Sequence, residues 1–201
     1  MNIEIRKLTP DMLDDYLHFF ETDAHADNDD EDRCYCVGWS GADDDESAMS
    51  SPEKRREQAI KYVGCGHIQG YLAYCGGKVV GWCNANDKSK CISCRGWKLF
   101  MSGVDADGAA PNAKIKSVFC YAIAPGMKRK GIATKLLERV CQDAADEGFD
   151  FVEAYPNKKF INIFRDFMGP LELYKRNGFA VCQEVKDKYS DIYVMRKPLK
   201  G

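Results

Sequence analysis

Residues 115–148 constrain the fold most, because they combine a strand, a basic turn and an amphipathic helix in that order. The residues up to Ile123 are rich in β-branched and aromatic side chains, which predicts a strand. Pro125 marks a short loop, and an apolar stripe at helical spacing follows over 132–145, before Gly148 ends the helix. Free N–H groups and the positive end of the helix dipole meet at this loop. The stretch therefore predicts a phosphate-binding site.

Three consecutive cations, Lys128, Arg129 and Lys130, add formal charge beside that loop. A bare run of charges is more often a solvated turn. The strand before it and the helix after it favour phosphate binding instead.

The residues after the helix predict how the sheet continues. Residues 149–155 read as the next strand, and a helix between two strands makes a crossover with parallel pairing. We expect a long loop over 86–113 with one helical turn. The other predicted elements are a strand over 2–8, helices starting near 10 and 52, a hairpin over 70–84, a short helix over 170–177 and a closing hairpin over 179–196.

The bulk properties predict one domain over residues 1–201, large enough to bury a core. No apolar run reaches the roughly 18–20 residues needed to span a bilayer. The first residues alternate like a strand and lack the apolar core of a signal peptide, so we expect a cytoplasmic protein. The net charge of −2 argues against a nucleic-acid partner.

Charge is unevenly distributed. Residues 21–46 hold eleven acids and one base, so an acidic segment sits on a basic body. This segment is either a solvated loop or an electrostatic guide for a cationic acceptor such as a polyamine, an aminoglycoside or a lysine-bearing peptide.

Ten cysteines are many for a chain of this length, and without an export signal we expect reduced thiols. Cys34 and Cys36, with Cys91 and Cys94, could supply four thiolates to zinc. The first spacing is tight for a chelate and the pairs lie far apart in sequence. Packed thiols are the simpler interpretation, and we expect no metal.

Two motifs resemble those of the GNAT superfamily of N-acetyltransferases. Residues 128–133 match the acetyl-CoA loop pattern Gln/Arg-x-x-Gly-x-Gly/Ala, with Lys128 in place of the usual Gln or Arg. Leu173 and Tyr174, followed by Gly178 and Phe179, look like the family's LY-x-x-x-GF signature. The chain is thereby identified as a bacterial-type member of the superfamily.

The resemblance implies a mixed α/β fold. Its central twisted sheet would have six to seven mostly antiparallel strands, one parallel βαβ crossover and helices on both faces. It further implies an acyltransferase that moves the acetyl group of acetyl-CoA to an amine by direct attack in a ternary complex. Tyr174 would protonate the departing CoA thiolate. The implied cofactor-binding residues are Ile123, Lys128, Arg129, Lys130, Gly131, Ile132, Ala133 and Thr134.

The general base is not evident. Many relatives carry a Glu on the strand before the loop, but residues 117–123 contain no carboxylate. Glu153 on the next strand, an acid of the 27–32 run, or water remain as candidates.

The acceptor is expected to be a primary amine of a small molecule or a peptide, bound by residues of 22–50 and 86–113. We expect a monomer or a homodimer. The alternatives are a catalytically impaired acyl-CoA-binding regulatory module and a thiol- or zinc-binding protein on the same fold. Candidate acceptor-binding residues are Cys34, Tyr35, Cys36, Trp39, Trp82 and Glu153.

Overall fold

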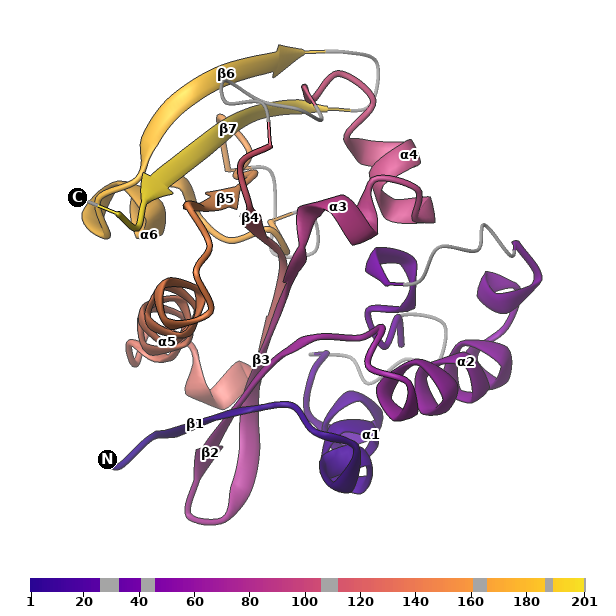
Figure 1. The fold of residues 1–201 in the computed structure, drawn as a ribbon. Coiled ribbons are helices and arrows are strands. Elements are labelled where there is room, and N and C mark those ends of the chain that lie inside the picture. The colour runs from indigo at the N-terminus through magenta and orange to yellow at the C-terminus, as the bar shows by residue number, and fades with distance from the viewer. Residues whose placement is uncertain (26–32, 41–45, 106–111, 161–165, 187–189, 201) are drawn as a thin grey trace.

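The computed structural model describes residues 1–25, 33–40, 46–105, 112–160, 166–186 and 190–200 (Figure 1). Its strands are β1 (Glu4–Lys7), β2 (Gly70–Cys75), β3 (Lys78–Asp87), β4 (Ile115–Ile123), β5 (Phe151–Ala154), β6 (Ala180–Lys186) and β7 (Asp191–Pro198). Its α-helices are α1 (Leu13–Thr22), α2 (Pro52–Gly64), α3 (Lys88–Cys91), α4 (Arg95–Phe100), α5 (Ile132–Asp146) and α6 (Leu171–Arg176). Short 3₁₀ helices are η1 (Pro10–Met12), η3 (Val37–Trp39), η4 (Glu46–Met49) and η5 (Pro125–Met127).

The strands form one seven-stranded sheet in the order β1-β2-β3-β4-β5-β7-β6. Only β4 and β5 pair in parallel among these strands, and α5 connects them. The predicted fold class, a mostly antiparallel sheet with one parallel βαβ crossover, is therefore confirmed.

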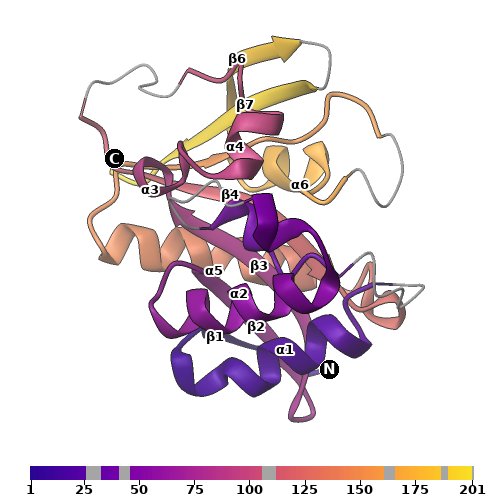
Figure 2. The same cartoon turned by 90° about the vertical axis from the view of Figure 1, so that its right-hand side faces the viewer.

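Helices cover both faces of the sheet, as predicted (Figure 2). In Figure 2, α1 and α2 lie in front of the β1–β3 part of the sheet and α5 lies behind it. The apolar stripe of α5 buries Leu136, Leu137 and Val140 against that rear face, together with Val118 of β4. On the opposite face, the buried rings of Tyr16, Phe20 and other aromatic residues form a second core.

Residues 86–113, predicted as a loop with one helical turn, contain two short helices instead. The Asp87 side chain accepts a hydrogen bond from the Ser89 N–H at 3.0 Å and starts α3. Cys94 starts α4 in the same way, its sulfur accepting from the Trp97 N–H at 3.4 Å. Cysteine is an unusual capping residue, which explains why sequence signals for this helix start were weak. No helix among the described residues is long and apolar enough to cross a membrane.

The two parallel strands separate halfway along β4. They pair from Ile115 with Phe151 to Val118 with Ala154, where β5 ends. The second half of β4 continues to Ile123 beside a different partner: the N–H of Tyr121 donates to the carbonyl oxygen of Phe167 at 2.6 Å. The separation of β4 from β5 opens the sheet beside the basic loop.

Candidate functional site

The basic loop joins the end of β4 to the start of α5. The chain leaves β4 at Ile123, makes the η5 turn and reverses through two left-handed residues, Arg129 (φ 61°) and Gly131 (φ 78°). α5 then begins at Ile132, and the Lys135 N–H donates to the Gly131 carbonyl oxygen at 3.1 Å. The first N–H groups of an α-helix have no carbonyl one turn earlier to accept them. They therefore point out of the helix start and are available to an anion.

Charged side chains surround this helix start. Lys128 and Arg129 line the adjoining cavity. Burial lowers the pKa of Lys128. The ammonium group of Lys130 lies 3.6 Å from the sulfur of Met127, on the loop itself. The local charge and the helix dipole have the same sign and favour a phosphate-bearing ligand.

A cavity of about 890 Å³ extends from this loop across the opening between β4 and β5. Its volume lies within the range of small-molecule and cofactor sites. At the loop end it is lined by Ile123, Lys128, Arg129, Gly131, Ile132, Ala133 and Thr134, seven of the eight residues expected to bind the cofactor. At the other end it is lined by His25, Cys34, Cys36, Trp39, Met49, Leu99, Phe100, Cys120, Phe160 and Phe167, among others.

The structure therefore brings together the predicted phosphate loop and three candidate acceptor-binding residues, Cys34, Cys36 and Trp39. Two further candidates lie behind the cavity wall. Trp82 is fully buried and donates its indole N–H to the sulfur of Cys36 at 3.2 Å. The carbonyl oxygen of Tyr35 accepts a hydrogen bond from the Tyr16 hydroxyl at 2.6 Å.

The cavity wall includes a cluster of three thiols. Tyr35 and Cys36 both adopt left-handed backbone conformations, with φ of 45° and 50°, which turns the chain tightly between Cys34 and Cys36. The pKa of Cys34 is raised by its hydrogen bond to Cys36 and by burial, and the pKa of Cys36 is raised by its contact with Cys120 and by burial. These thiols are therefore protonated and uncharged near neutral pH.

Cys120 on β4 is the third thiol. Its contact with Cys36 lowers its pKa, but burial and the neighbouring thiols Cys34 and Cys83 outweigh that contact, and the net pKa is raised. No local pattern in the sequence indicates that a thiol from β4 would face the Cys34–Cys36 turn. The alternation of side chains along a strand assigns each residue to one face of the sheet, but it does not say which distant segment covers that face.

Tyr174 lies on α6 beside the opening. Its hydroxyl donates to the carbonyl oxygen of Met168 at 2.5 Å, and its ring packs edge-on against Phe179 with centroids 5.3 Å apart. The side chain is fully buried, whereas its neighbours Leu173 and Tyr121 line the cavity. Burial raises the pKa of Tyr174 well above its ordinary value, so the phenol keeps its proton.

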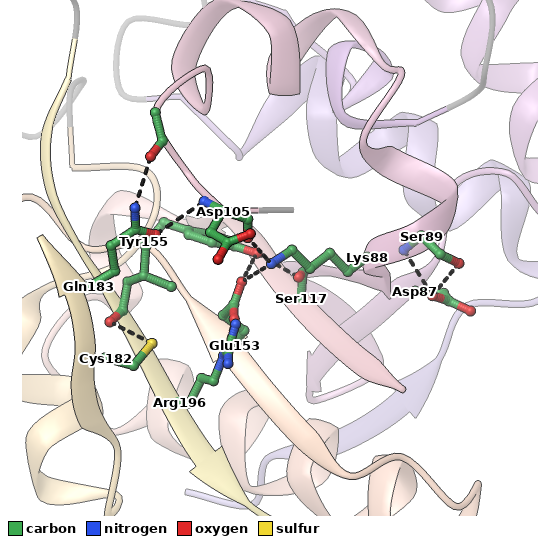
Figure 3. A network of polar contacts seen from close by, with 12 residues as sticks. Asp87, Lys88, Ser89, Asp105, Ser117, Glu153, Tyr155, Cys182, Gln183 and Arg196 are labelled. Carbon is green, nitrogen blue, oxygen red and sulfur yellow. Dashed lines mark hydrogen bonds and ion pairs between the residues drawn. The ribbon is translucent and has the colours of Figure 1, made fainter. Parts of the chain in front are cut away.

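Glu153, a candidate general base, lies in a buried ion network instead of among the residues that line the cavity (Figure 3). One carboxylate oxygen accepts from Lys88 Nζ at 2.8 Å and from the Tyr155 hydroxyl at 2.7 Å. The other accepts from Arg196. Tyr155 also contacts the Ser117 hydroxyl at 2.7 Å. The network ties α3 to β4, β5 and β7. The other acidic candidates, in 27–32, fall outside the described residues.

The two cysteine pairs considered for zinc, Cys34 with Cys36 and Cys91 with Cys94, do not form one four-thiolate group. Among the described residues, no group of three or more His, Cys, Asp or Glu side chains is arranged to hold a metal ion. The Cys91 thiol donates to the carbonyl oxygen of Trp39 at 3.5 Å, and Cys94 caps α4.

Several cavity residues were not named individually from the sequence: His25, Met49, Leu99, Phe100, Cys120, Tyr121, Phe160 and Phe167. Four of them, His25, Met49, Leu99 and Phe100, lie within 22–50 and 86–113, the segments expected to bind the acceptor. The other four lie on β4 or between β5 and α6, and no local pattern says that these segments meet the two loops.

Comparison with known proteins identifies the family to which the chain belongs. The sequence model described as "Acetyltransferase (GNAT) family" matches residues 10–169, most of the chain. The chain belongs to the GNAT acetyltransferase family. The match contains the loop at 128–134 and ends just before α6, which carries Tyr174. A search of curated sequences finds no match.

Solved structures of GNAT enzymes share the fold at low sequence identity. The PaiA N-acetyltransferase of Thermoplasma acidophilum, solved in complex with coenzyme A, has a TM-score of 0.55 and 16% identity, covering 98% of this chain and 99% of its own. The ribosomal-protein-S18-alanine N-acetyltransferase of Escherichia coli has a TM-score of 0.54 and 16% identity over 100% and 96%. The polyamine N-acetyltransferase of Drosophila melanogaster has a TM-score of 0.58 and 11% identity over 98% and 100%. At these identities the comparison supports the fold and not a particular acceptor.

Proposed function

We propose that this GNAT-family chain is a single-domain, acetyl-CoA-dependent N-acetyltransferase that acetylates a primary amine. The observation that carries the proposal is one continuous cavity, lined at one end by the basic loop and at the other by Cys34, Cys36 and Trp39. A cavity with a phosphate-binding end and a separate apolar end suits two substrates bound at once. That arrangement supports direct transfer in a ternary complex.

The loop end would hold the cofactor. The N–H groups at the start of α5 would bind the pyrophosphate of CoA, with Lys128 and Arg129 adding charge. The Thr134 hydroxyl lines the same end and would add a further donor. The pantetheine arm would then lie along the half of β4 that no longer has β5 as its neighbour, near Ile123, in the manner of an added strand.

In the transfer step, the nitrogen of a neutral amine attacks the thioester carbonyl carbon, forming a C–N bond. The C–S bond then breaks and the sulfur leaves as a thiolate, which takes a proton from Tyr174. The nitrogen gives up its extra proton to solvent or to a nearby base, and the Tyr174 phenolate takes a proton back from solvent, so charge and protons balance. Tyr174 is protonated near neutral pH and lies beside Leu173 and Tyr121, which line the cavity. To act as the general acid, its hydroxyl would exchange the hydrogen bond to the Met168 carbonyl oxygen for one to the departing sulfur.

The Tyr174→Phe variant tests this function. We expect kcat to fall by a factor of about 100 or more, the low end for loss of a general acid, while the affinity for CoA changes little. Tyr193→Phe is the control, because Tyr193 lies on β7 and does not line the cavity. CoA affinity is measured by calorimetry and the acetylated product by mass spectrometry. Unchanged turnover in Tyr174→Phe would remove Tyr174 from the mechanism, and a protein that binds no CoA would overturn the function.

A further inference from the structure

Three aromatic side chains form a cluster at the acceptor end of the cavity. The ring centroids of Trp39 and Phe100 are 5.9 Å apart, those of Trp39 and Phe167 are 6.2 Å apart, and those of Phe100 and Phe167 are 6.0 Å apart. All three residues line the cavity. They come from η3, α4 and the segment before α6, so three separate parts of the chain converge to present aromatic surface to one ligand site.

The Trp39 ring is fixed in place from behind. It stacks on Phe119 with centroids 4.9 Å apart and ring planes 11° apart, and Phe119 in turn stacks on Tyr155 at 5.7 Å and 12°. On another side, Gly96 of α4 leaves no space: a Cβ there would lie 2.7 Å from two ring atoms of Trp39. The aromatic wall is therefore preorganised, which lowers the entropic cost of binding a flat apolar group.

Much of the lining around these rings is apolar or uncharged, although His25, Arg95 and Asp166 also line the cavity. Met49 and Leu99 line it together with the three thiols of Cys34, Cys36 and Cys120, which are protonated near neutral pH. Leu99 and Phe160 are large apolar residues that line the cavity and are exposed to solvent, at 48% and 77%. Apolar side chains kept at a solvent-exposed position in a cavity suggest an apolar ligand.

Acidic groups are few in the described part of the lining. The described lining contains two acidic residues, Asp166 and Glu172. It contains four basic residues, Arg95, Lys128, Arg129 and Arg176. Asp166 already accepts a hydrogen bond from the Asn157 amide at 2.8 Å. A polyamine carries further ammonium groups away from the reacting nitrogen, and each would need a carboxylate when it leaves water. The described lining does not supply such a row of carboxylates.

We infer that the acceptor is a primary amine carried on an aromatic group, with the ring bound against Trp39, Phe100 and Phe167. The inference rests on the proposed N-acetyltransferase function and narrows its substrate class. The aromatic group would stack on or meet the edges of the three rings, while the amine reaches toward the opening between β4 and β5. An aryl amine carries only the charge of its own amino group, and deprotonation before attack removes that charge. Unlike a polyamine, it therefore has no further charge to bury.

A matched panel of amines tests the inference. Tryptamine and 2-phenylethylamine are compared with agmatine and spermidine at saturating acetyl-CoA, with acetylated product measured by mass spectrometry so that the protein's own thiols do not interfere. We expect kcat/KM for the aryl amines to exceed that for the polycations at least about tenfold, the low end of what a hydrophobic pocket contributes per methylene.

Variants of the aromatic residues test whether these rings cause the preference for aryl amines. Trp39→Ala and Phe167→Ala should lower the preference for aryl amines about tenfold or more, and Trp39→Phe should restore part of it. Phe151→Ala is the matched control for Phe167→Ala, because both rings are partly buried and Phe151 does not line the cavity. CoA affinity should be unchanged in all of them.

The outcomes separate this inference from the function on which it rests. A protein that binds CoA and acetylates agmatine or spermidine more efficiently than the aryl amines would overturn the aromatic acceptor and leave the proposed function standing. An aryl-amine preference that survives Trp39→Ala and Phe167→Ala would overturn the assigned binding surface. A protein that binds CoA but acetylates no amine of the panel would overturn the aromatic acceptor, and a protein that binds no CoA would overturn the proposed function and this inference with it.

Discussion

Lys88 Nζ lies 2.8 Å from Glu153 Oε1, and the two side chains are only 4% and 0% exposed. The same carboxylate also binds Arg196 and the Tyr155 hydroxyl. Tyr155 stacks on Phe119, which stacks on Trp39 in the cavity wall. A buried ion pair is thus connected by contacts between packed rings to the proposed acceptor site.

Replacing Glu153 by Gln should destabilise the protein by about 3–5 kcal/mol, because Lys88 and Arg196 would remain buried without a countercharge. Urea unfolding measures the loss. The control is Lys200→Met, which removes the exposed partner of Asp150, with a 65% exposed side chain. That change should cost less than about 1 kcal/mol.

Glu153→Gln also tests the assignment of the general base. Glu153 does not line the cavity, so the folded variant should keep turnover within a few-fold of the wild type. Turnover lost by several orders of magnitude in a variant that still unfolds cooperatively would mean that Glu153 acts in the reaction.

Gly169→Ala should lower both stability and turnover. Gly169 has φ of +87°, and a Cβ there would lie 2.9 Å from the Tyr174 hydroxyl oxygen and 3.0 Å from the Tyr121 ring. Gly178→Ala is the matched control, since it has φ of +82° but nothing within 4 Å of the added Cβ. Both variants should lose about 1–2 kcal/mol of stability from the left-handed backbone, measured by thermal unfolding. Only Gly169→Ala should also displace Tyr174 and reduce kcat, and equal effects on kcat would contradict this.

Gly131→Ala should weaken CoA binding. Gly131 precedes α5 with φ of +78°, and nothing lies within 4 Å of an added Cβ, so the strain is purely conformational. A non-glycine residue in this left-handed conformation costs about 1 kcal/mol. The loop would relieve that strain by moving away from the shape that presents its N–H groups to phosphate. Calorimetry should find a several-fold higher Kd for CoA. Gly126→Ala, in the same loop with nothing near its Cβ, should leave the Kd unchanged.

Gly96→Ala should weaken binding of the acceptor without changing the affinity for CoA. The added Cβ would lie 2.7 Å from ring atoms of Trp39 and 2.8 Å from the Gly38 carbonyl oxygen, so Trp39 or α4 must move. We expect a higher KM for the acceptor at an unchanged Kd for CoA. Gly64→Ala at the end of α2, with open space at its Cβ, is the control. A similar rise in KM for both variants would show that the close approach of Gly96 to Trp39 is unimportant.

Stability should fall at alkaline pH, partly through Cys141. Burial on the inner face of α5 raises the pKa of Cys141 from 9.0 to about 11. Because the folded state holds this proton more tightly, the stabilising contribution is complete below pH 9 and is lost as the pH rises through 11. The contribution amounts to at most ~3 kcal/mol. Urea unfolding from pH 8 to 11 should therefore show a shallower decline in Cys141→Ala than in the wild type, and parallel declines would contradict the shift.

The sequence by itself determined the central part of the fold. The strand ending at Ile123, the apolar stripe of the next helix and the strand after it are local patterns, with periods that correspond to one secondary structure each. A helix between two such strands leaves a parallel crossover as the only short connection. The position of the loop at 128–134 before the helix was predictable for the same reason, since the loop and the helix start are made by consecutive residues.

Only the tertiary structure decided what lies opposite that loop. Cys34, Cys120 and Phe167 are far apart in sequence, and no local pattern records that they line one cavity. The role of Glu153 also depended on the tertiary structure. Its position on the strand next to β4 made it a plausible base, but Lys88 and Arg196 hold it in a buried network. A side chain's neighbours across the fold depend on how helices and loops pack onto the sheet, and that packing is set by many weak contacts at once. For this reason most residues at the loop end of the cavity could be named from the chain, whereas at the other end only Cys34, Cys36 and Trp39 could be named.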